Sequence, residues 1–244
     1  MEGAQVMYRF QGRDVFETVA EMVNPAHTVV MVHDMQNDFL HKDGAYRKAG
    51  ENYVVVAQDE QLQPHIDVST ILGPMIEFVR KARGYGVKIW QTNYTNLPDF
   101  GSFDDAMVNK RWALMNDPAE RDHANPVVLG TWGNKTIDEL KPQEGDIVVN
   151  KYRTNTFIHS NFELLLRSHG IKTIIPTGPA TEVGILPTYW YAVLVGFFPV
   201  VPRDLVSARV AEYHEDAMKF LERLVWVVDS SEILEAWEKG SQST

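Results

Sequence analysis

The clearest apolar segment of the chain is residues 29–32, where four apolar residues follow one another without alternation. An uninterrupted run of this kind is typical of a strand buried on both faces, as in the centre of a parallel sheet. Asp34 follows the run closely, so its carboxylate is expected at the carboxyl end of the strand. In open α/β sheets that edge is where ligands bind.

Further apolar segments have the length of strands, and segments with helical periodicity lie between them. Strands that alternate with helices of this length indicate a parallel sheet, because each helix can carry the chain back to the start of the next strand. Such crossovers are right-handed, and the helices cover both faces of the sheet. The pattern therefore predicts an α/β fold with a mostly parallel sheet of about six strands. The further strands are predicted at residues 87–90, 147–149, 173–176, 197–201 and 225–228, and the helices at 69–82, 136–140, 161–169, 182–195, 211–224 and 233–237.

The chain is predicted to divide into a short arm and one domain. Residues 1–26 form the N-terminal arm, with a short helix at 15–22. Residues 27–244 form a single domain, which is long enough to bury a large core. Within it, residues 92–127 carry several aromatic side chains and no long periodic segment. Such an insertion supplies substrate contacts or packs on its own domain, and the two interpretations stay open.

Composition excludes several classes of site. The chain has no cysteine, which rules out disulfides, thiolate metal ligands and a cysteine nucleophile. A formal net charge of -10 without clustered Lys and Arg argues against nucleic-acid and anionic-membrane partners. The longest apolar stretch, residues 189–201, contains Gly196 and Pro199 and is too short to span a bilayer. The N-terminus lacks the apolar region of a signal peptide, so a cytoplasmic location is expected.

Two charged residues and a turn follow predicted strands at the points where the strands end. Asp34 follows the first strand, Lys151 follows the third, and residues 177–184 lead from the fourth strand into a helix. Because the carboxyl ends of parallel strands share one edge, we expect the three to converge. A buried carboxylate beside a lysine forms a coupled pair that can hold or release a proton. The N–H groups at a helix start suit a negative oxygen that forms in a transition state.

Each of these features also has a purely structural interpretation. An acid after a strand often caps the next helix or fixes a turn, and this interpretation is stronger for Asp38 than for Asp34. Taken alone, Lys151 is typical of a surface lysine. Only the joint occurrence of these residues at successive strand ends favours a site.

Four segments resemble those of a known family. They are residues 33–39 (HDMQNDF), 130–133 (GTWG), 151–157 (KYRTNTF) and 177–184 (TGPATEVG). On these segments the chain is similar to the isochorismatase-like, or cysteine hydrolase, superfamily over residues 26–237. The resemblance implies a single Rossmann-like three-layer αβα domain with a parallel sheet. It also implies an Asp, Lys and Cys triad, and a cis peptide expected here at Pro179-Ala180.

The resemblance places the family's aspartate on Asp34, its lysine on Lys151 and its cysteine on Gly184. A thioester route to amide hydrolysis needs a thiolate, and this chain has none. Neither Thr181 nor Thr188 is predicted to replace it, because no sequence spacing places an activating histidine beside either.

Glycine at this position resembles the family's true isochorismatases, which cleave a vinyl ether with water and no covalent intermediate. The likeness to that subgroup is incomplete. Those enzymes have a Gln after the second strand and a Tyr after the Thr-Gly pair, where this chain has Tyr94 and Ala180.

The resulting hypothesis is a cofactor-independent hydrolase of a small organic substrate in which water replaces the protein nucleophile. Asp34 exchanges protons, Lys151 holds its charge, and backbone N–H groups near Val183 and Gly184 stabilise the oxyanion. The turn includes Pro179 and Ala180. The GTWG segment resembles amide-cleaving members and favours a C–N bond of amide, carbamate or urea type. A vinyl-ether hydrolase and an inactive binding or scaffold homologue are the alternatives.

Aromatic residues are available to line the substrate pocket, although such residues are more often core than ligand contacts. No metal site is predicted, because Asp99 is not followed by a suitable histidine. The family resemblance implies a homo-oligomer. The proposed substrate contacts are Phe39, Trp90, Tyr94, Trp132 and Tyr189.

Overall fold

The computed structural model describes residues 8–45, 68–108 and 125–242. At its centre is a twisted sheet whose main strand order is β5-β4-β3-β6-β7-β9, with a short strand β8 paired to β6. Each pair of neighbouring strands in this sheet is parallel. The strands are β3 (Thr28–His33), β4 (Lys88–Tyr94), β5 (Ile147–Lys151), β6 (Thr173–Pro179), β7 (Phe198–Pro202), β8 (Val206–Ser207) and β9 (Trp226–Val228).

The predicted α/β class is confirmed, and each predicted strand is present. The apolar runs located the strand cores, but β3, β4, β5 and β6 all extend further towards their carboxyl ends than the runs did. In β4 and β5 the extensions are polar residues, and polar side chains at the ends of parallel strands carry no hydrophobic signal.

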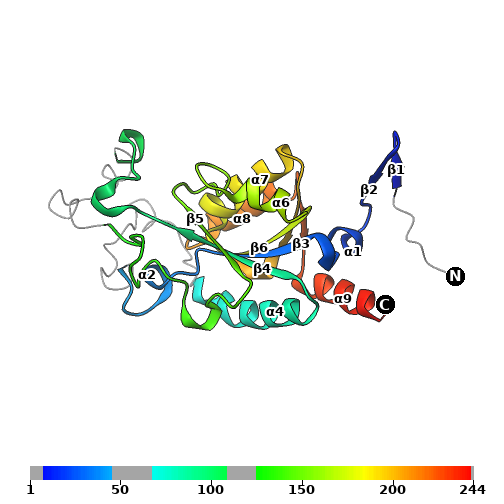
Figure 1. Ribbon diagram of the computed structural model, residues 1–244, viewed down its shortest axis with the longest axis horizontal. Helices are drawn as coiled ribbons and strands as arrows, with labels where there is room; N and C mark the ends of the chain where they lie inside the picture. Colours follow the sequence, from blue (N-terminus) through cyan, green and yellow to red (C-terminus); the bar gives the residue numbers. More distant parts are fainter. Residues whose placement is uncertain (1–7, 46–67, 109–124, 243–244) are drawn as a thin grey trace.

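Helices cover both faces of the sheet (Figure 1). On one face lie α4 (Leu72–Gly84) and α9 (Ser230–Ser241), and on the other lie α6 (Phe162–Ser168), α7 (Leu186–Leu194) and α8 (Ala211–Leu221). A hydrophobic core lies on each face of the sheet, and successive residues of β3 point into opposite cores. Val30 packs in the cluster that contains Phe78 of α4, and Met31 packs in the cluster that contains Tyr189 of α7. The remaining short helices are α1 (Val19–Met22), α2 (Asn37–Leu40), η1 (Pro25–His27), η4 (Val68–Ile71), η5 (Pro98–Phe100), η7 (Asp138–Leu140) and η9 (Arg203–Leu205).

The strand order reverses between β3 and β6. From β3 the chain adds β4 and β5 on one side, and from β6 it adds β7 and β9 on the other. In open α/β sheets such a reversal leaves a crevice at the carboxyl ends of the two central strands. The residue that follows β3 is Asp34, so the fold places this carboxylate at the crevice.

The N-terminal segment differs from the prediction. Instead of a helix over residues 15–22, it forms an antiparallel hairpin of β1 (Tyr8–Phe10) and β2 (Arg13–Val15) before α1 begins. Gln11 and Gly12 both have positive φ, which matches the twist of a two-residue hairpin turn. The helix starts later because Thr18 caps it: its hydroxyl accepts from the Glu21 N–H, and the Glu21 carboxylate accepts in return from the Thr18 N–H.

The helix predicted over residues 182–195 also differs at its start. Residues Thr181–Ile185 form a π-helical turn, η8, and regular α-helix begins only at Leu186. Single π turns of this kind often occur at functional sites.

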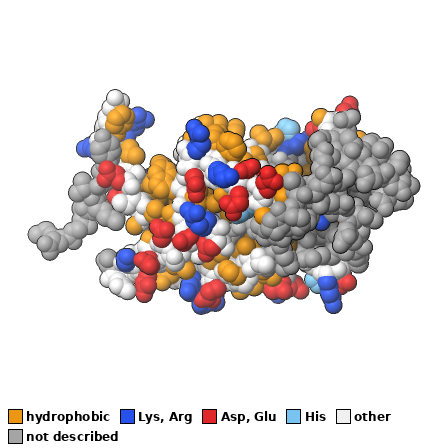
Figure 2. All heavy atoms as spheres, turned by 180° about the vertical axis from the view of Figure 1, so that it is seen from behind, with side chains coloured by type: hydrophobic (Ala, Val, Ile, Leu, Met, Phe, Trp, Pro, Cys, Tyr) orange, Lys and Arg blue, Asp and Glu red, His pale blue; other side chains and the backbone are white. Residues whose placement is uncertain are grey.

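Two further features concern the charge distribution on the surface and the length of the helices. On the face seen in Figure 2, acidic and basic side chains of the described residues are interspersed. Within the described ranges, none of the helices has both the length and the apolar character needed to cross a bilayer.

Candidate active site

Asp34 and Lys151 form a buried ion pair at the carboxyl edge of the sheet. The Lys151 Nζ lies 2.8 Å from Asp34 Oδ2. Lys151 is fully buried and Asp34 is 9% exposed. The lysine ends β5 and the aspartate follows β3, so the lysine side chain crosses the end of β4, which lies between them. The convergence of these two strand ends was expected from the sequence, and the structure brings them together.

The second oxygen of the Asp34 carboxylate is held by β4. Its Oδ1 accepts from the Tyr94 N–H at 3.1 Å and from the Thr92 hydroxyl at 3.5 Å. The Asp34 backbone has φ of 47°, a left-handed conformation that few residues other than glycine adopt. Conformations of this kind cluster at functional sites and cost on the order of 1 kcal/mol. The surrounding hydrogen bonds therefore fix the carboxylate in a direction that the backbone alone would not favour.

Burial dominates the acid–base character of Asp34. Desolvation raises the pKa of the carboxyl above its ordinary value, while the charge of Lys151 and hydrogen bonds from Lys151, Tyr94 and Thr92 act in the opposite direction. A carboxyl with a raised pKa is better able to alternate between accepting and donating a proton near neutral pH.

The α7 helix supports Lys151 through the loop that follows β5. The Lys151 Nζ donates to the Thr154 carbonyl oxygen at 3.1 Å. Thr188 of α7 donates its hydroxyl to the same oxygen at 3.4 Å and accepts from the Thr156 N–H at 3.1 Å. Thr188 is four residues after Gly184, on the same side of the helix. Direct contacts thus join the lysine segment to α7, the helix that follows the turn carrying Gly184.

The turn after β6 packs closely on the residue before Asp34. Gly178 has φ of 113°, and a Cβ added to it would lie 2.4 Å from the His33 carbonyl oxygen. Only glycine meets both requirements. The peptide bond between Pro179 and Ala180 is cis, as the family resemblance implied.

Gly184 is buried, and its position has room for a side chain. A Cβ added there would meet only the Pro179 carbonyl oxygen, at 3.8 Å, which is an ordinary contact. The Gly184 N–H donates to the Ala180 carbonyl oxygen at 2.9 Å. The expectation that this N–H serves the oxyanion is therefore at odds with the structure, because the π turn already uses it. Val183, the other expected contributor, is 52% exposed.

The GTWG segment, residues 130–133, packs against Asp38 of the segment 33–39. The Asp38 N–H donates to the Gly133 carbonyl oxygen at 3.0 Å, and the Asp38 carboxylate accepts from the N–H groups of Val127, at 2.6 Å, and Ala45, at 3.1 Å. A Cβ on Gly133 would overlap the Asp38 carboxylate, at 2.0 Å from Oδ2. Asp38 therefore has the structural role that the sequence favoured for it.

The five aromatic residues expected to contact substrate are not gathered at one place. Trp90 is 1% exposed within the core cluster beneath α6 and α7, so the structure does not bring it to the site. Tyr189 is fully buried in the same cluster. Tyr94 meets Asp34 through its backbone N–H. Phe39 is half-buried on α2, and Trp132 is 47% exposed and edge-on to the His41 ring.

Sequence reasoning missed a contact beside the turn. The Thr181 hydroxyl lies 2.9 Å from Nδ1 of His214, which reaches it from α8. This corrects the expectation that no histidine lies beside Thr181. The two residues are 33 positions apart, so no local spacing signals the contact.

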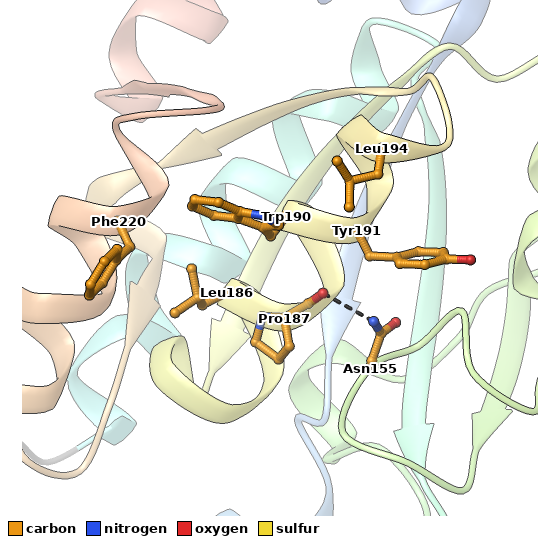
Figure 3. Close-up of a pocket in the computed structure, with 7 residues that line it drawn as sticks. All are labelled: Asn155, Leu186, Pro187, Trp190, Tyr191, Leu194 and Phe220. Carbon is orange, nitrogen blue, oxygen red and sulfur yellow. Dashed lines mark hydrogen bonds between the residues drawn. The ribbon is translucent and has the colours of Figure 1, made fainter.

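A groove lined by described residues lies away from the ion pair (Figure 3). It has a volume of about 500 Å³ on the outer side of α7, and Phe220 of α8 closes one side. Asn155 borders it and donates to the Pro187 carbonyl oxygen at 3.1 Å. Neither Asp34 nor Lys151 lines this groove. Its lining residues are Asn155, Leu186, Pro187, Trp190, Tyr191, Leu194 and Phe220.

A metal centre has no support in residues 8–45, 68–108 and 125–242. In these ranges no group of three or more His, Asp or Glu side chains is arranged to hold an ion.

Comparisons with known proteins agree with this geometry. The family described as Isochorismatase domain matches residues 28–232. The ureidoacrylate amidohydrolase RutB of Pseudomonas savastanoi pv. phaseolicola is 29% identical over 208 residues, which make up 81% of this chain and 78% of that protein.

Solved structures show the same fold. An isochorismatase-like hydrolase from Alkaliphilus metalliredigens has a TM-score of 0.68 and 21% identity, covering 86% of this chain and 99% of its own. A cysteine hydrolase from Pseudomonas syringae pv. phaseolicola also has a TM-score of 0.68, with 20% identity, and covers 89% and 95% of the two chains.

The family match spans most of the chain and includes Asp34, Lys151 and Gly184. The sheet order, the buried acid–lysine pair and the cis peptide after the Thr-Gly pair lie within it. On these grounds the chain belongs to the isochorismatase family of hydrolases, as a member in which glycine stands in place of the nucleophilic cysteine.

Proposed function

We propose that this protein is a cofactor-independent hydrolase that cleaves a C–N bond of amide, carbamate or urea type in a small organic substrate. The observation that carries the proposal is the buried Asp34–Lys151 pair, with 2.8 Å between Nζ and Oδ2, in a chain without cysteine. The pair supplies proton transfer at the sheet edge where α/β folds bind ligands. The nucleophile is then a water molecule.

Each proton has an assigned path in this mechanism. Ionised Asp34 takes a proton from the water, whose oxygen bonds to the carbonyl carbon and pushes its electron pair onto the carbonyl oxygen. The resulting tetrahedral intermediate collapses, the C–N bond breaks, and protonated Asp34 returns the proton to the leaving nitrogen. Lys151 stays charged and stabilises the anionic form of Asp34 at the start and end of the cycle.

The oxyanion is assigned to backbone donors at the start of η8. Ala180 and Val183 are the proposed donors, with the turn held by Pro179. Because the Gly184 N–H is paired with the Ala180 carbonyl oxygen, Gly184 contributes space for the attacking water rather than a donor. Phe39, Tyr94 and Trp132 are the remaining proposed substrate contacts.

The C–N assignment draws on the relatives. The family match and the resemblance to a ureidoacrylate amidohydrolase support hydrolysis of a small amide or ureido compound. Vinyl-ether hydrolysis is the second candidate: glycine at position 184 suggests it through the family resemblance, but the relatives do not favour it. A scaffold without activity is disfavoured, because burying both Asp34 and Lys151 costs free energy that a decayed site has no reason to retain.

A hydrolysis screen tests the proposal. Purified protein is assayed on aryl amides, carbamates, ureas, ureido acids and a vinyl ether, in parallel with Asp34→Asn and with Asp216→Asn, an exposed acid in an i,i+3 ion pair, as the control. We expect C–N cleavage, lost by about a hundredfold or more in Asp34→Asn and unchanged in the control. Full activity of folded Asp34→Asn contradicts the mechanism, and turnover of the vinyl ether alone favours the second candidate.

The remaining expectations stay predictions. We propose that residues 1–26 act as an arm on the domain at 27–244, that the protein works in the cytoplasm on a small-molecule substrate, and that it forms a homo-oligomer. Cell fractionation tests the location, and light scattering coupled to size-exclusion chromatography tests the oligomeric state.

A further inference from the structure

A chain of buried polar side chains runs from α7 to the Asp34 carboxylate. His33, the last residue of β3, is fully buried, and its Nε2 hydrogen-bonds the hydroxyl of Tyr189, which is fully buried as well. The His33 Nδ1 lies 2.9 Å from the Thr92 hydroxyl oxygen. That oxygen lies 3.5 Å from Asp34 Oδ1. The proposed mechanism assigns no part to His33, Thr92 or Tyr189.

The number of available protons fixes the direction of these hydrogen bonds. The Thr92 hydroxyl has one proton, and an ionised Asp34 can only accept. If Thr92 donates to Asp34, the His33 Nδ1 must carry a proton and donate to Thr92. The His33 Nε2 then has a free electron pair and accepts from the Tyr189 hydroxyl. All three donors therefore point towards Asp34.

The opposite direction leaves a proton unpaired. If Thr92 donated to His33, the His33 Nε2 would donate to the Tyr189 oxygen, and the Tyr189 proton would need another acceptor. Within the described part of the chain, the Tyr189 hydroxyl has no hydrogen-bond partner other than His33. A buried hydroxyl proton without a partner is costly, so the first arrangement is favoured.

The chain is neutral and closed to solvent. Burial, together with the charge of Lys151, holds the pKa of His33 well below its ordinary value. Burial and the charge of Asp34 raise the pKa of the Tyr189 hydroxyl well above its ordinary value. Because Tyr189 is fully buried, the chain ends in the core and offers no proton path to water.

We propose that His33 is a positioning residue for Asp34: as a neutral imidazole with its proton on Nδ1, it orients the Thr92 hydroxyl towards the carboxylate and stabilises the ionised form. Tyr189 fixes this tautomer from α7. The catalytic role of this hydrogen-bond chain rests on the proposed function, in which Asp34 transfers the proton. The tautomer itself does not depend on it.

Enzyme kinetics test the catalytic part. His33→Leu removes the donor, and His33→Asn keeps an N–H donor near the position of Nδ1. We expect kcat of His33→Leu to fall by about tenfold or more with KM changed less than threefold, and the acid limb of its pH profile to move up by about one unit. His33→Asn should restore most of the wild-type kcat and most of the wild-type position of the acid limb. A merely structural role would not move the acid limb.

A double substitution distinguishes an effect through the hydrogen-bond chain from two independent structural perturbations. Thr92→Val breaks the same chain one step closer to Asp34, so the acid limb of His33→Leu/Thr92→Val should match that of Thr92→Val alone. Additive displacements of the acid limb would overturn the proposal. So would a wild-type acid limb and kcat in folded His33→Leu.

The tautomer is measured on the wild-type protein without any substrate. Two-dimensional ¹⁵N–¹H correlation of the imidazole nitrogens, with His33→Asn used to assign the signals, should show His33 protonated at Nδ1 near neutral pH. A proton on Nε2, or on both nitrogens, overturns the proposal. Since this readout needs no turnover, it stands apart from the hydrolysis screen, where inactivity of the wild type on every substrate would reject the proposed function alone.

Discussion

A Cβ placed on Gly184 would meet only the carbonyl oxygen of Pro179, at 3.8 Å. The position to which the family resemblance assigns the cysteine is thus sterically open, although the chain has no cysteine at all. A cysteine side chain can therefore be introduced at this position as a test of the proposed site.

Gly184→Cys is expected to fold and to cleave amides faster than the wild type, by about tenfold or more, because a thiolate is a stronger nucleophile than water. Mass spectrometry should detect an acyl adduct on Cys at this position. Gly184→Ala is the control, since it adds the Cβ without the sulfur. Equal rates for Gly184→Cys and Gly184→Ala would show that this position does not face the substrate.

Lys151→Met should destabilise the protein, because it leaves Asp34 buried without its counter-charge. Removing one partner of a buried pair costs about 3 kcal/mol or more, so the free energy of unfolding measured by chemical denaturation at pH 7 should fall by about that amount. Lys219→Met, which breaks the exposed pair with Asp216, should change the free energy of unfolding far less, because solvent screens an exposed ion pair. Similar losses in the two variants would contradict a buried charged pair.

Activity should rise with pH across an acid limb set by Asp34. Burial raises its pKa above the ordinary 3.8, and the mechanism needs the ionised form, so kcat/KM should fall as the pH drops through the raised value. The midpoint is read from the pH profile. A midpoint at or below 3.8 would contradict the assignment of Asp34.

Stability should change in the opposite direction over the same range. With its pKa raised in the folded state, native Asp34 keeps a proton that the unfolded chain has lost, so its contribution to the free energy of unfolding falls as the pH rises from 3.8 through the raised value. Chemical denaturation at several pH values should show the wild type losing stability relative to Asp34→Asn in that window. A gain in the stability of the wild type relative to Asp34→Asn over this window would mean that the pKa of Asp34 is lowered in the folded state, not raised.

Thr181 has a histidine beside it, and its role as a nucleophile can be tested directly. Asp34 already supplies proton transfer, with Lys151 as its counter-charge, so we expect the contact between Thr181 and His214 to hold the turn against α8. Thr181→Val should therefore keep activity within about tenfold, and mass spectrometry of wild-type reactions should find no adduct on residues 177–184. Thr181→Ser, which keeps the hydroxyl, is the control. An adduct on Thr181 would replace water as the nucleophile.

Gly178→Ala should cost more stability than Gly196→Ala. Both glycines have positive φ, so both substitutions carry the strain of a left-handed alanine, about 1 kcal/mol. Only at Gly178 would the new Cβ also press on the His33 carbonyl oxygen, whereas nothing lies within 4 Å at Gly196. Thermal unfolding should rank Gly178→Ala below Gly196→Ala, and activity should fall only in Gly178→Ala. Equal melting temperatures would mean that the backbone moves freely at Gly178.

The sequence by itself determined the sheet and the two charged ends of the site. Residues 29–32 form a central strand because an uninterrupted apolar run can be buried in few other ways. Asp34 and Lys151 were found because each lies two residues after an apolar run, and strand ends meet at one edge in a parallel sheet. The absence of cysteine, and with it the loss of the thioester route, was also decided by sequence alone.

Only the tertiary structure decided which side chains complete the site. Trp90 and Tyr189 are aromatic in the sequence whether they face a substrate or the core, and the packing of α6 and α7 turned both inward. His33 and Tyr189 lie 156 residues apart, and their contact depends on how α7 packs over β3. Local patterns report how each segment is buried, but the pairing of polar groups across elements follows from register and packing, which are non-local.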